Sequence, residues 1–188
     1  MVSCIAVVRR VLCVGFPLVL LTVACGNSGA VAPSGQSGSG IQDDASLFRL
    51  ITQTEPLTAY VPFPNAEEFT AGRLNGSEAH RPIVRTSLNA RAMSALQMGR
   101  LPAGSRFPDG SVVLKEIKPS AVGPAMTYAV MYRDAANRFA SNGWVWAEFS
   151  PSGSVQYAVS NRGAACTSCH QRERGPQNDL VRTFERQP

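Results

Sequence analysis

Residues 111–118 read Ser-Val-Val-Leu-Lys-Glu-Ile-Lys and follow a Pro-Asp-Gly turn at 108–110. Runs of similar texture, rich in β-branched and aromatic residues, recur at 126–133, 143–149 and 154–160. Such short runs between turn residues are typical of strands. Ser-Pro-Ser-Gly joins the last two runs and favours a hairpin. We therefore predict an antiparallel sheet in the second half of the chain.

Upstream of this sheet the sequence predicts a short helix, a loop and one more strand. Asp44 can cap a helix whose apolar residues recur at helical spacing, namely Leu47, Leu50 and Ile51. Residues 55–80 are rich in Pro, Gly and Asn and read as loop. Residues 82–88 then have the composition of a strand.

Further short helices are expected to flank the sheet. Asn89 can cap a helix that runs through Met98 and is closed by Gly99. Two terminal helices are predicted at 162–170 and 179–185. The predicted fold class is therefore α+β, a mostly antiparallel sheet with flanking short helices and a C-terminal helix that carries a C-x-x-C-H motif.

The chain has 188 residues, enough for one domain that buries a core without disulfides or metals. Its net charge of +5 falls to +3 without Arg9 and Arg10, which lie in a segment that we expect to be removed. This excess is too weak for a nucleic-acid claim, and no basic run is interleaved with aromatic residues. We therefore predict one folded domain and no nucleic-acid partner.

Residues 1–24 have the pattern of an export signal, because an apolar run at 11–21 follows basic residues. The run is too short to span a bilayer unaided. Leu-Thr-Val-Ala precedes Cys25 and resembles a bacterial lipobox, in which the cysteine becomes the lipidated N-terminus. We therefore expect a periplasmic protein that is held at the cell envelope by lipid on Cys25 alone. Simple secretion is the alternative.

Residues 25–43 are the expected tether. Up to Gly40 they are almost wholly Gly, Ser, Ala, Asn, Gln and Pro, too poor in apolar groups to fold. The predicted organisation is thus a lipoprotein-type signal peptide at 1–24, this tether, and a haem-binding domain at 44–188 for the reasons that follow.

Cys166 and Cys169 are the cysteines of the folded domain, because Cys4 and Cys13 leave with the signal. With His170 they form Cys-Thr-Ser-Cys-His. Two thiols one helical turn apart can bond the two vinyl groups of a haem, and the histidine that follows then lies under the iron. The motif and the export signal predict one covalently attached haem c, bonded to both cysteines and ligated by His170.

A redox disulfide and a zinc site are the alternatives for this motif. A thioredoxin-type pair lies at the start of a helix in a βαβ unit, and the sequence predicts no such unit. Zinc would need four ligands, and His80 is the only other histidine. Haem is therefore the preferred interpretation.

Only 18 residues follow His170, and none of them is methionine. Small electron-transfer cytochromes take a downstream methionine as the sixth ligand of the iron. Here a sixth ligand would have to come from upstream, from Met93, Met98, Met126, Met131 or His80. We therefore predict an open, five-coordinate iron that binds or converts a small molecule. A simple periplasmic electron-transfer cytochrome with an upstream sixth ligand is the alternative.

Several short motifs follow one another between His80 and Phe184. They are Val-Arg-Thr-Ser-Leu-Asn at 84–89, Phe-Pro-Asp-Gly-Ser-Val-Val-Leu-Lys-Glu at 107–116, Met-Tyr-Arg-Asp at 131–134, Asn-Gly-Trp-Val-Trp at 142–146, Cys-Thr-Ser-Cys-His at 166–170 and Asp-Leu-Val at 179–181. In content, order and spacing this stretch resembles the cytochrome P-460 family, which includes the β-sheet cytochromes c-prime.

The resemblance implies an antiparallel sheet with helices beside it, a homodimer and a five-coordinate c-type haem. In the enzymes of this family a lysine at the position of Lys115 is bonded to the haem ring, and the protein oxidises hydroxylamine. Relatives without that bond look like binders of nitric oxide. Strand alternation places Lys115 on the face of Val113 and Ile117, which supports such a role. The alternative is a lysine at a strand end that reaches to water.

The chain departs from the enzymes of this family at two positions. In them a carboxylate on the following strand is the proton acceptor, but residues 123–132 contain none. Loss of a general base typically lowers a rate by about 10² to 10⁴. Arg182 stands where the family has an aromatic residue. We therefore expect nitric oxide binding with slow or absent hydroxylamine oxidation, and a redox partner protein for any turnover as a hydroxylamine or nitric oxide oxidoreductase.

Overall fold

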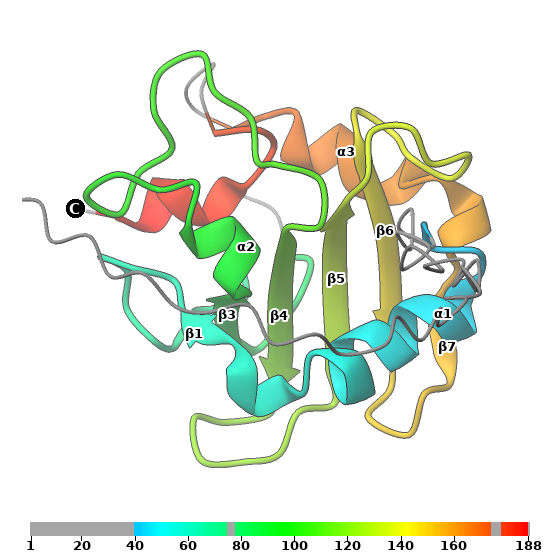
Figure 1. The fold of residues 1–188 in the computed structure, drawn as a ribbon. Coiled ribbons are helices and arrows are strands. Elements are labelled where there is room, and N and C mark those ends of the chain that lie inside the picture. Colours follow the sequence, from blue (N-terminus) through cyan, green and yellow to red (C-terminus); the bar gives the residue numbers. More distant parts are fainter. Residues whose placement is uncertain (1–39, 75–77, 174–177, 188) are drawn as a thin grey trace, which may run out of the picture. The chain divides into compact units, whose positions relative to one another are not determined.

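The predicted strands form one antiparallel sheet in the computed structural model, which describes residues 40–74, 78–173 and 178–187. In this described part of the chain the sheet has seven strands in the order β1-β3-β4-β5-β6-β7, and β2 also pairs with β3 (Figure 1). The strands are β1 (Val61–Pro62), β2 (Thr70–Ala71), β3 (Ile83–Leu88), β4 (Val112–Lys118), β5 (Thr127–Arg133), β6 (Trp144–Phe149) and β7 (Val155–Tyr157). The predicted α+β class is confirmed.

The strand predictions are correct for the strands that are long enough to show an alternating pattern of residues. β3, β4, β5 and β6 match the predicted runs to within one residue at each end. β7 ends early, because residues Val159–Asn161 form a 3₁₀ turn. β1 and β2 lie in the predicted loop at 55–80, so that part of the prediction is wrong. Strands of two residues are too short to show alternation, and only pairing with β3 defines them.

The first helix, α1 (Asp44–Arg49), begins one residue away from the predicted cap. Its N-cap is Asp43 rather than Asp44, because the Asp43 carboxylate accepts a 2.7 Å hydrogen bond from the Ser46 amide. A π-helical turn (Leu50–Thr54) continues α1, and a 3₁₀ turn (Leu57–Ala59) follows.

The second helix, α2 (Ala90–Met93), is shorter than predicted. Asn89 caps it as expected, by accepting a hydrogen bond from the Ala92 amide at 2.9 Å. The helix ends at Met93 instead of Met98, and Met98 has a left-handed φ of 49° that no α-helix can include.

The two C-terminal helices also start later than predicted, for the same backbone reason. α3 (Ala164–His170) follows Arg162 and Gly163, whose φ values of 50° and 67° are left-handed. The final element is a 3₁₀ helix (Arg182–Arg186) rather than a helix at 179–185. Two consecutive residues with positive φ precede it, as described with the site below.

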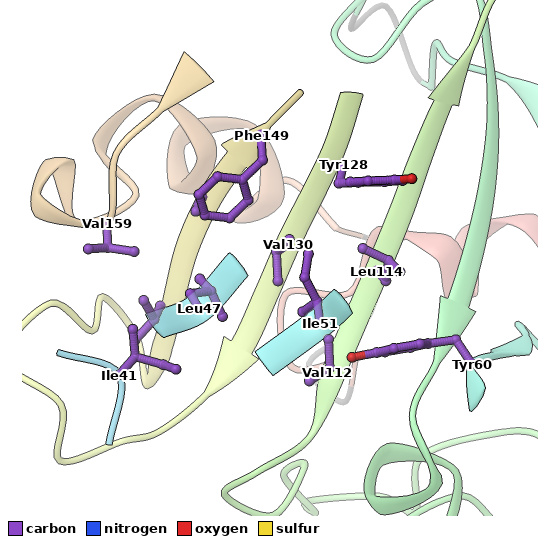
Figure 2. Packing of buried hydrophobic residues seen from close by; sticks show 12 residues of the cluster. Ile41, Leu47, Ile51, Tyr60, Val112, Leu114, Tyr128, Val130, Phe149 and Val159 are labelled. Atoms are coloured by element: carbon purple, nitrogen blue, oxygen red, sulfur yellow. The ribbon is translucent and has the colours of Figure 1, made fainter. Parts of the chain in front are cut away.

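One face of the sheet packs against α1. Leu47 and Ile51 lie over Val112, Leu114 and Val130, and all five side chains are almost fully buried (Figure 2). Burial of one such side chain contributes about 1.5 to 3 kcal/mol. This cluster therefore holds α1 on β4 and β5 and leaves the opposite face of the sheet to the C-terminal segment.

The opposite face carries a second cluster of buried residues, including Val113, Met131, Trp144 and Trp146. Val113, Met131 and Trp146 are direct cross-strand neighbours. Residues from α3 and from the C-terminal 3₁₀ helix pack against this cluster. The functional motif therefore lies over the face of β4 that carries Lys115.

No helix within residues 40–74, 78–173 and 178–187 is long and apolar enough to cross a bilayer. The predicted signal at 1–24, Cys25 and most of the predicted tether at 25–43 lie outside the described residues. Ile41, near the end of that tether, is buried in the first core cluster.

Candidate functional site

A cavity of about 220 Å³ lies between the sheet and the C-terminal segment. The chemically active side chains that line it come from β4, β6, α3, the loop before β3 and the 3₁₀ helix, namely Lys115, Glu148, Cys166, Cys169, His170, His80 and Arg182. A smaller cavity of about 30 Å³ shares most of these residues and extends to Ala129 and Met131. The structure thus brings together the predicted haem-binding residues and Lys115.

The sheet register sets a row of side chains along the cavity. Lys115 on β4 is paired with Ala129 on β5, and Ala129 is paired with Glu148 on β6. Residues directly opposite in an antiparallel sheet share a face. Lys115 and Glu148 therefore lie on the same cavity wall, with the Ala129 methyl group between them in the row. Val113 lines the smaller cavity with Lys115, so the prediction that these two residues share a face is correct.

Glu148 is a candidate residue that sequence reasoning missed. Residues 123–132, which include most of the strand that follows Lys115, contain no carboxylate. The carboxylate comes instead from the next strand in the sheet. Alternation places Glu148 on the same face of the strand as Trp144 and Trp146. A charged residue on an otherwise apolar strand face was therefore the sequence signal that could have identified it.

Helix α3 carries the thiols and the imidazole of the motif. Cys166 and Cys169 are not joined in a disulfide, and both line the cavity. His170 is 8% exposed, and its ring contacts the Trp146 ring at 4.8 Å between centroids. Burial, with a smaller contribution from the Lys115 cation, lowers the pKa of His170 to about 3, so the imidazole is neutral at pH 7.

The two ring nitrogens of His170 have different roles. Nδ1 lies 2.7 Å from the carbonyl oxygen of Leu180, which can only accept a hydrogen bond. Nδ1 therefore carries the proton, and Nε2 carries the lone pair. A histidine whose other nitrogen is fixed in this way is the usual form of a metal-ligating histidine.

The Leu180 carbonyl is held by a strained turn. Asp179 and Leu180 both have left-handed φ values, 45° and 68°. The Asp179 carboxylate is fully buried and accepts hydrogen bonds from the Phe107 amide at 3.0 Å and from Arg106 at 2.8 Å. Trp144 Nε1 donates to the Asp179 carbonyl at 3.0 Å. These contacts fix the backbone that orients His170.

Lys115, His80 and Glu148 are close to one another. The Lys115 Nζ is 3.3 Å from His80 Nδ1, and a Glu148 carboxylate oxygen is 3.4 Å from His80 Nε2. Burial, then the charge of Arg186, lowers the pKa of Lys115 to about 8. Burial and the neighbouring Lys115 also lower the pKa of His80. Part of the Lys115 population is therefore an uncharged amine near neutral pH.

Arg182, where an aromatic residue was expected, lies on the cavity wall. Its Nη1 is 3.0 Å from the Cys169 sulfur, and its Nε donates to Glu185 at 2.9 Å. The guanidinium is almost fully buried. It thus adds a fixed positive charge beside the motif.

The five upstream candidates for a sixth iron ligand differ in their exposure and in the cavity that they line. Met98 and Met126 are 95% and 44% exposed. Met93 packs beside the second core cluster, and Met131 lines only the smaller cavity. His80 is the one candidate of the five that lines the larger cavity.

The comparisons with known proteins agree with this site. The family model for cytochrome P460 matches residues 75–183, more than half of the chain. The chain belongs to the cytochrome P460 family. Cytochrome P460 proteins bind haem, so this is a haem protein. A search of the curated proteins finds no significant match.

The residues present fit the haem of a cytochrome P460 protein. Two unpaired thiols one helical turn apart and the neutral His170 line one cavity. Within the described residues, no group of three or more His, Cys, Asp or Glu side chains is placed to hold a metal ion by itself. These donors are of the kinds that a haem takes, thiols for its edge and a neutral imidazole for its iron.

Asp179→Ala should destabilise the protein by about 3 to 5 kcal/mol, because the largely buried Arg133 guanidinium and the Phe107 amide lose their carboxylate partner. Guanidinium denaturation followed by tryptophan fluorescence measures this loss. Glu78→Ala is the matched control, since Glu78 pairs with Arg81 at 2.8 Å at the surface and should cost less than about 1 kcal/mol. Equal effects of the two variants would contradict the supporting role of Asp179.

Proposed function

We propose that this protein carries one haem c, bonded to Cys166 and Cys169 and ligated by His170, and binds or converts small nitrogen compounds such as nitric oxide or hydroxylamine. The observation that carries the proposal is His170, whose Nδ1 is held by Leu180 while both thiols line the same cavity. Family membership supports the haem, and the motif supports its covalent attachment.

The haem supplies an iron that can bind the nitrogen atom of such a ligand and accept electrons from it. Oxidation of hydroxylamine to nitric oxide releases protons and electrons in equal number, so a proton acceptor and a redox partner protein are both needed. Glu148 lies on the cavity wall and can accept a proton. Its presence removes the objection that the strand after Lys115 has no carboxylate.

Lys115 supports an enzymatic role. Its pKa of about 8 leaves part of the population as an uncharged nucleophile in the cavity. The enzymes of this family, by the resemblance described above, bond a lysine at this position to the haem ring. Lys115 and Glu148 together favour hydroxylamine oxidation over simple nitric oxide binding.

An electron-transfer cytochrome is the second candidate, and the specific observation in its favour is His80 in the cavity with His170. A pure electron carrier gives no role to an uncharged lysine and a carboxylate beside the iron site. Small-ligand chemistry is therefore the preferred function.

Covalent haem attachment is expected to depend on both cysteines. Co-expression with a haem-lyase system should yield a chain heavier by one haem, stable to acid and organic solvent, because thioethers do not hydrolyse. Cys166→Ala together with Cys169→Ala should yield only the apo mass, while Ser168→Ala, in the exposed position between them, keeps the haem. Recovery of the wild type at the apo mass would contradict the proposal.

Glu148→Gln should lower the rate of hydroxylamine oxidation by about 10² to 10⁴, because the cavity loses its base. Stopped-flow reduction of an external electron acceptor measures the rate. Glu116→Gln is the control, since Glu116 is paired with Arg85 at 3.5 Å on the opposite face of β4. Brisk turnover by Glu148→Gln would exclude Glu148 as the proton acceptor.

We also propose that the protein is anchored in the periplasm through lipid on Cys25 and acts as a homodimer. The lipid anchor rests on the sequence pattern before Cys25, and the homodimer rests on the resemblance to the family. Cys25→Ala should move the protein from the membrane fraction to the soluble periplasm, because the acyl chains are its only anchor. Cys4→Ala is the control, and a wild type found wholly in the soluble fraction would refute the anchor.

A further inference from the structure

The guanidinium of Arg182 is a buried cation in direct contact with the motif. Arg182 begins the C-terminal 3₁₀ helix, and its side chain is only 6% exposed. Its Nη1 lies 3.0 Å from the Cys169 sulfur. Val181 and Phe184, on either side in the sequence, are buried in the second core cluster and hold this segment against the sheet. The cation is therefore fixed beside one of the two sulfurs that would bond the haem.

The helix type explains the carboxylate that accompanies this cation. A 3₁₀ helix has three residues per turn, so side chains at positions i and i+3 lie one above the other. Arg182 and Glu185 have this spacing, and Arg182 Nε donates to Glu185 at 2.9 Å. The Glu185 side chain is 5% exposed. A carboxylate partner of this kind allows a guanidinium to stay charged when it is buried.

Glu185 offsets only part of the charge of Arg182. The guanidinium spreads its charge over three nitrogens. Glu185 contacts Nε, whereas Nη1 contacts a sulfur and Nη2 has no hydrogen-bond partner within the described residues. The cation is therefore the member of the ion pair that contacts Cys169.

Covalent attachment would bring the haem next to this cation. In a haem c the cysteine sulfur is bonded to a carbon that is itself bonded to the porphyrin ring. A group in contact with the Cys169 sulfur is therefore close to the edge of the macrocycle. The propionates of a haem are at the edge opposite its vinyl groups, so Arg182 is not placed to pair with them.

A positive charge at that edge favours the reduced form of a haem. Reduction from ferric to ferrous removes one positive charge from the haem, and with it the repulsion by a neighbouring cation. Proteins set haem potentials through burial, nearby charge and hydrogen bonds. Solvent and salt screen a buried charge much less than an exposed one, so the effect of Arg182 is expected to persist at physiological ionic strength.

The other charged side chains of the cavity are placed differently. Lys115, Arg186 and Glu148 line the cavity with Arg182. Part of the Lys115 population is uncharged near neutral pH, and Arg186 donates to the Ala71 carbonyl at 2.9 Å. Among the described residues, Arg182 is the charged side chain that hydrogen-bonds a cysteine of the motif.

From these contacts we propose that Arg182 raises the reduction potential of the haem and so makes its iron a better acceptor of electrons from a small nitrogen compound. The inference rests on the proposed function, because it needs a haem bonded to Cys169. Electrons taken from the compound go on to the redox partner protein, and Arg182 keeps its proton and its charge throughout. Arg182 is a positioning residue, because it places a fixed charge and takes no part in bond formation.

The test measures the midpoint potentials of holoproteins whose haem content is established by the pyridine haemochrome assay. Arg182→Gln should lower the one-electron equilibrium constant for reduction about tenfold, a fall of about 59 mV in potential. Glu185→Gln should shift the potential upwards, because the charge that offsets Arg182 is lost. Arg172→Gln is the matched control and should leave the potential unchanged, since Arg172 is an exposed cation just after α3 that solvent screens.

The sign of the two shifts separates an electrostatic role from a structural one. Loosening of the ion pair alone would move both variants in the same direction, so shifts of equal sign in Arg182→Gln and Glu185→Gln overturn the proposal. A potential of Arg182→Gln equal to that of the wild type also overturns it and leaves the proposed function intact. Absence of covalent haem from the wild type refutes the proposed function itself.

A further comparison keeps the test decisive if Arg182→Gln does not fold, because that variant removes one half of a buried ion pair. The double variant Arg182→Gln with Glu185→Gln removes both charges. Its potential should lie about tenfold in equilibrium constant below that of Glu185→Gln, since the two proteins differ only in the cation. Equal potentials of these two variants would overturn the role of Arg182.

Discussion

Nδ1 of His170 donates a 2.7 Å hydrogen bond to the Leu180 carbonyl, and the chemistry of the cavity depends on it. The bond decides which ring nitrogen keeps a lone pair, and it fixes the ring at the end of a helix of only seven residues. The carbonyl is presented by two left-handed residues, whose strain is offset by the buried contacts of the Asp179 carboxylate. A C-terminal segment of little regular structure thus orients the key side chain through one backbone atom.

The charges around the cavity follow from the same packing. Lys115, Arg182 and Arg186 line it together with a single carboxylate on the sheet, Glu148. Burial removes water from these groups and disfavours their charged forms, and each cation further disfavours a positive charge on its neighbours. The low pKa of Lys115 is one result. Arg186 also donates to the Ala71 carbonyl at 2.9 Å and so links the 3₁₀ helix to β2.

The parts of the fold that were predictable are those encoded in local patterns. Alternation over six or seven residues located β3 to β6 and oriented Lys115 correctly, and Asn89 marked the start of α2. The parts that were not predictable depend on pairing between distant segments. β1 and β2 exist only through β3, and Glu148 reaches the cavity only because β6 pairs with β5 in a given register. Several of the left-handed residues that shorten the predicted helices, namely Met98, Arg162 and Leu180, are not glycine, so their backbone conformation could not be predicted from residue type.

Ala129 gives this register a consequence for ligand size. It lies between Lys115 and Glu148 in the same cross-strand row, on backbones that are about 10 Å apart across three strands. Above this small methyl group the His80 ring lies between the amine and the carboxylate, 3.3 Å from Lys115 Nζ and 3.4 Å from a Glu148 oxygen. Side-chain volume at residue 129 therefore sets how much space remains beside the amine, the imidazole and the carboxylate, because Ala129 and His80 line the same small cavity.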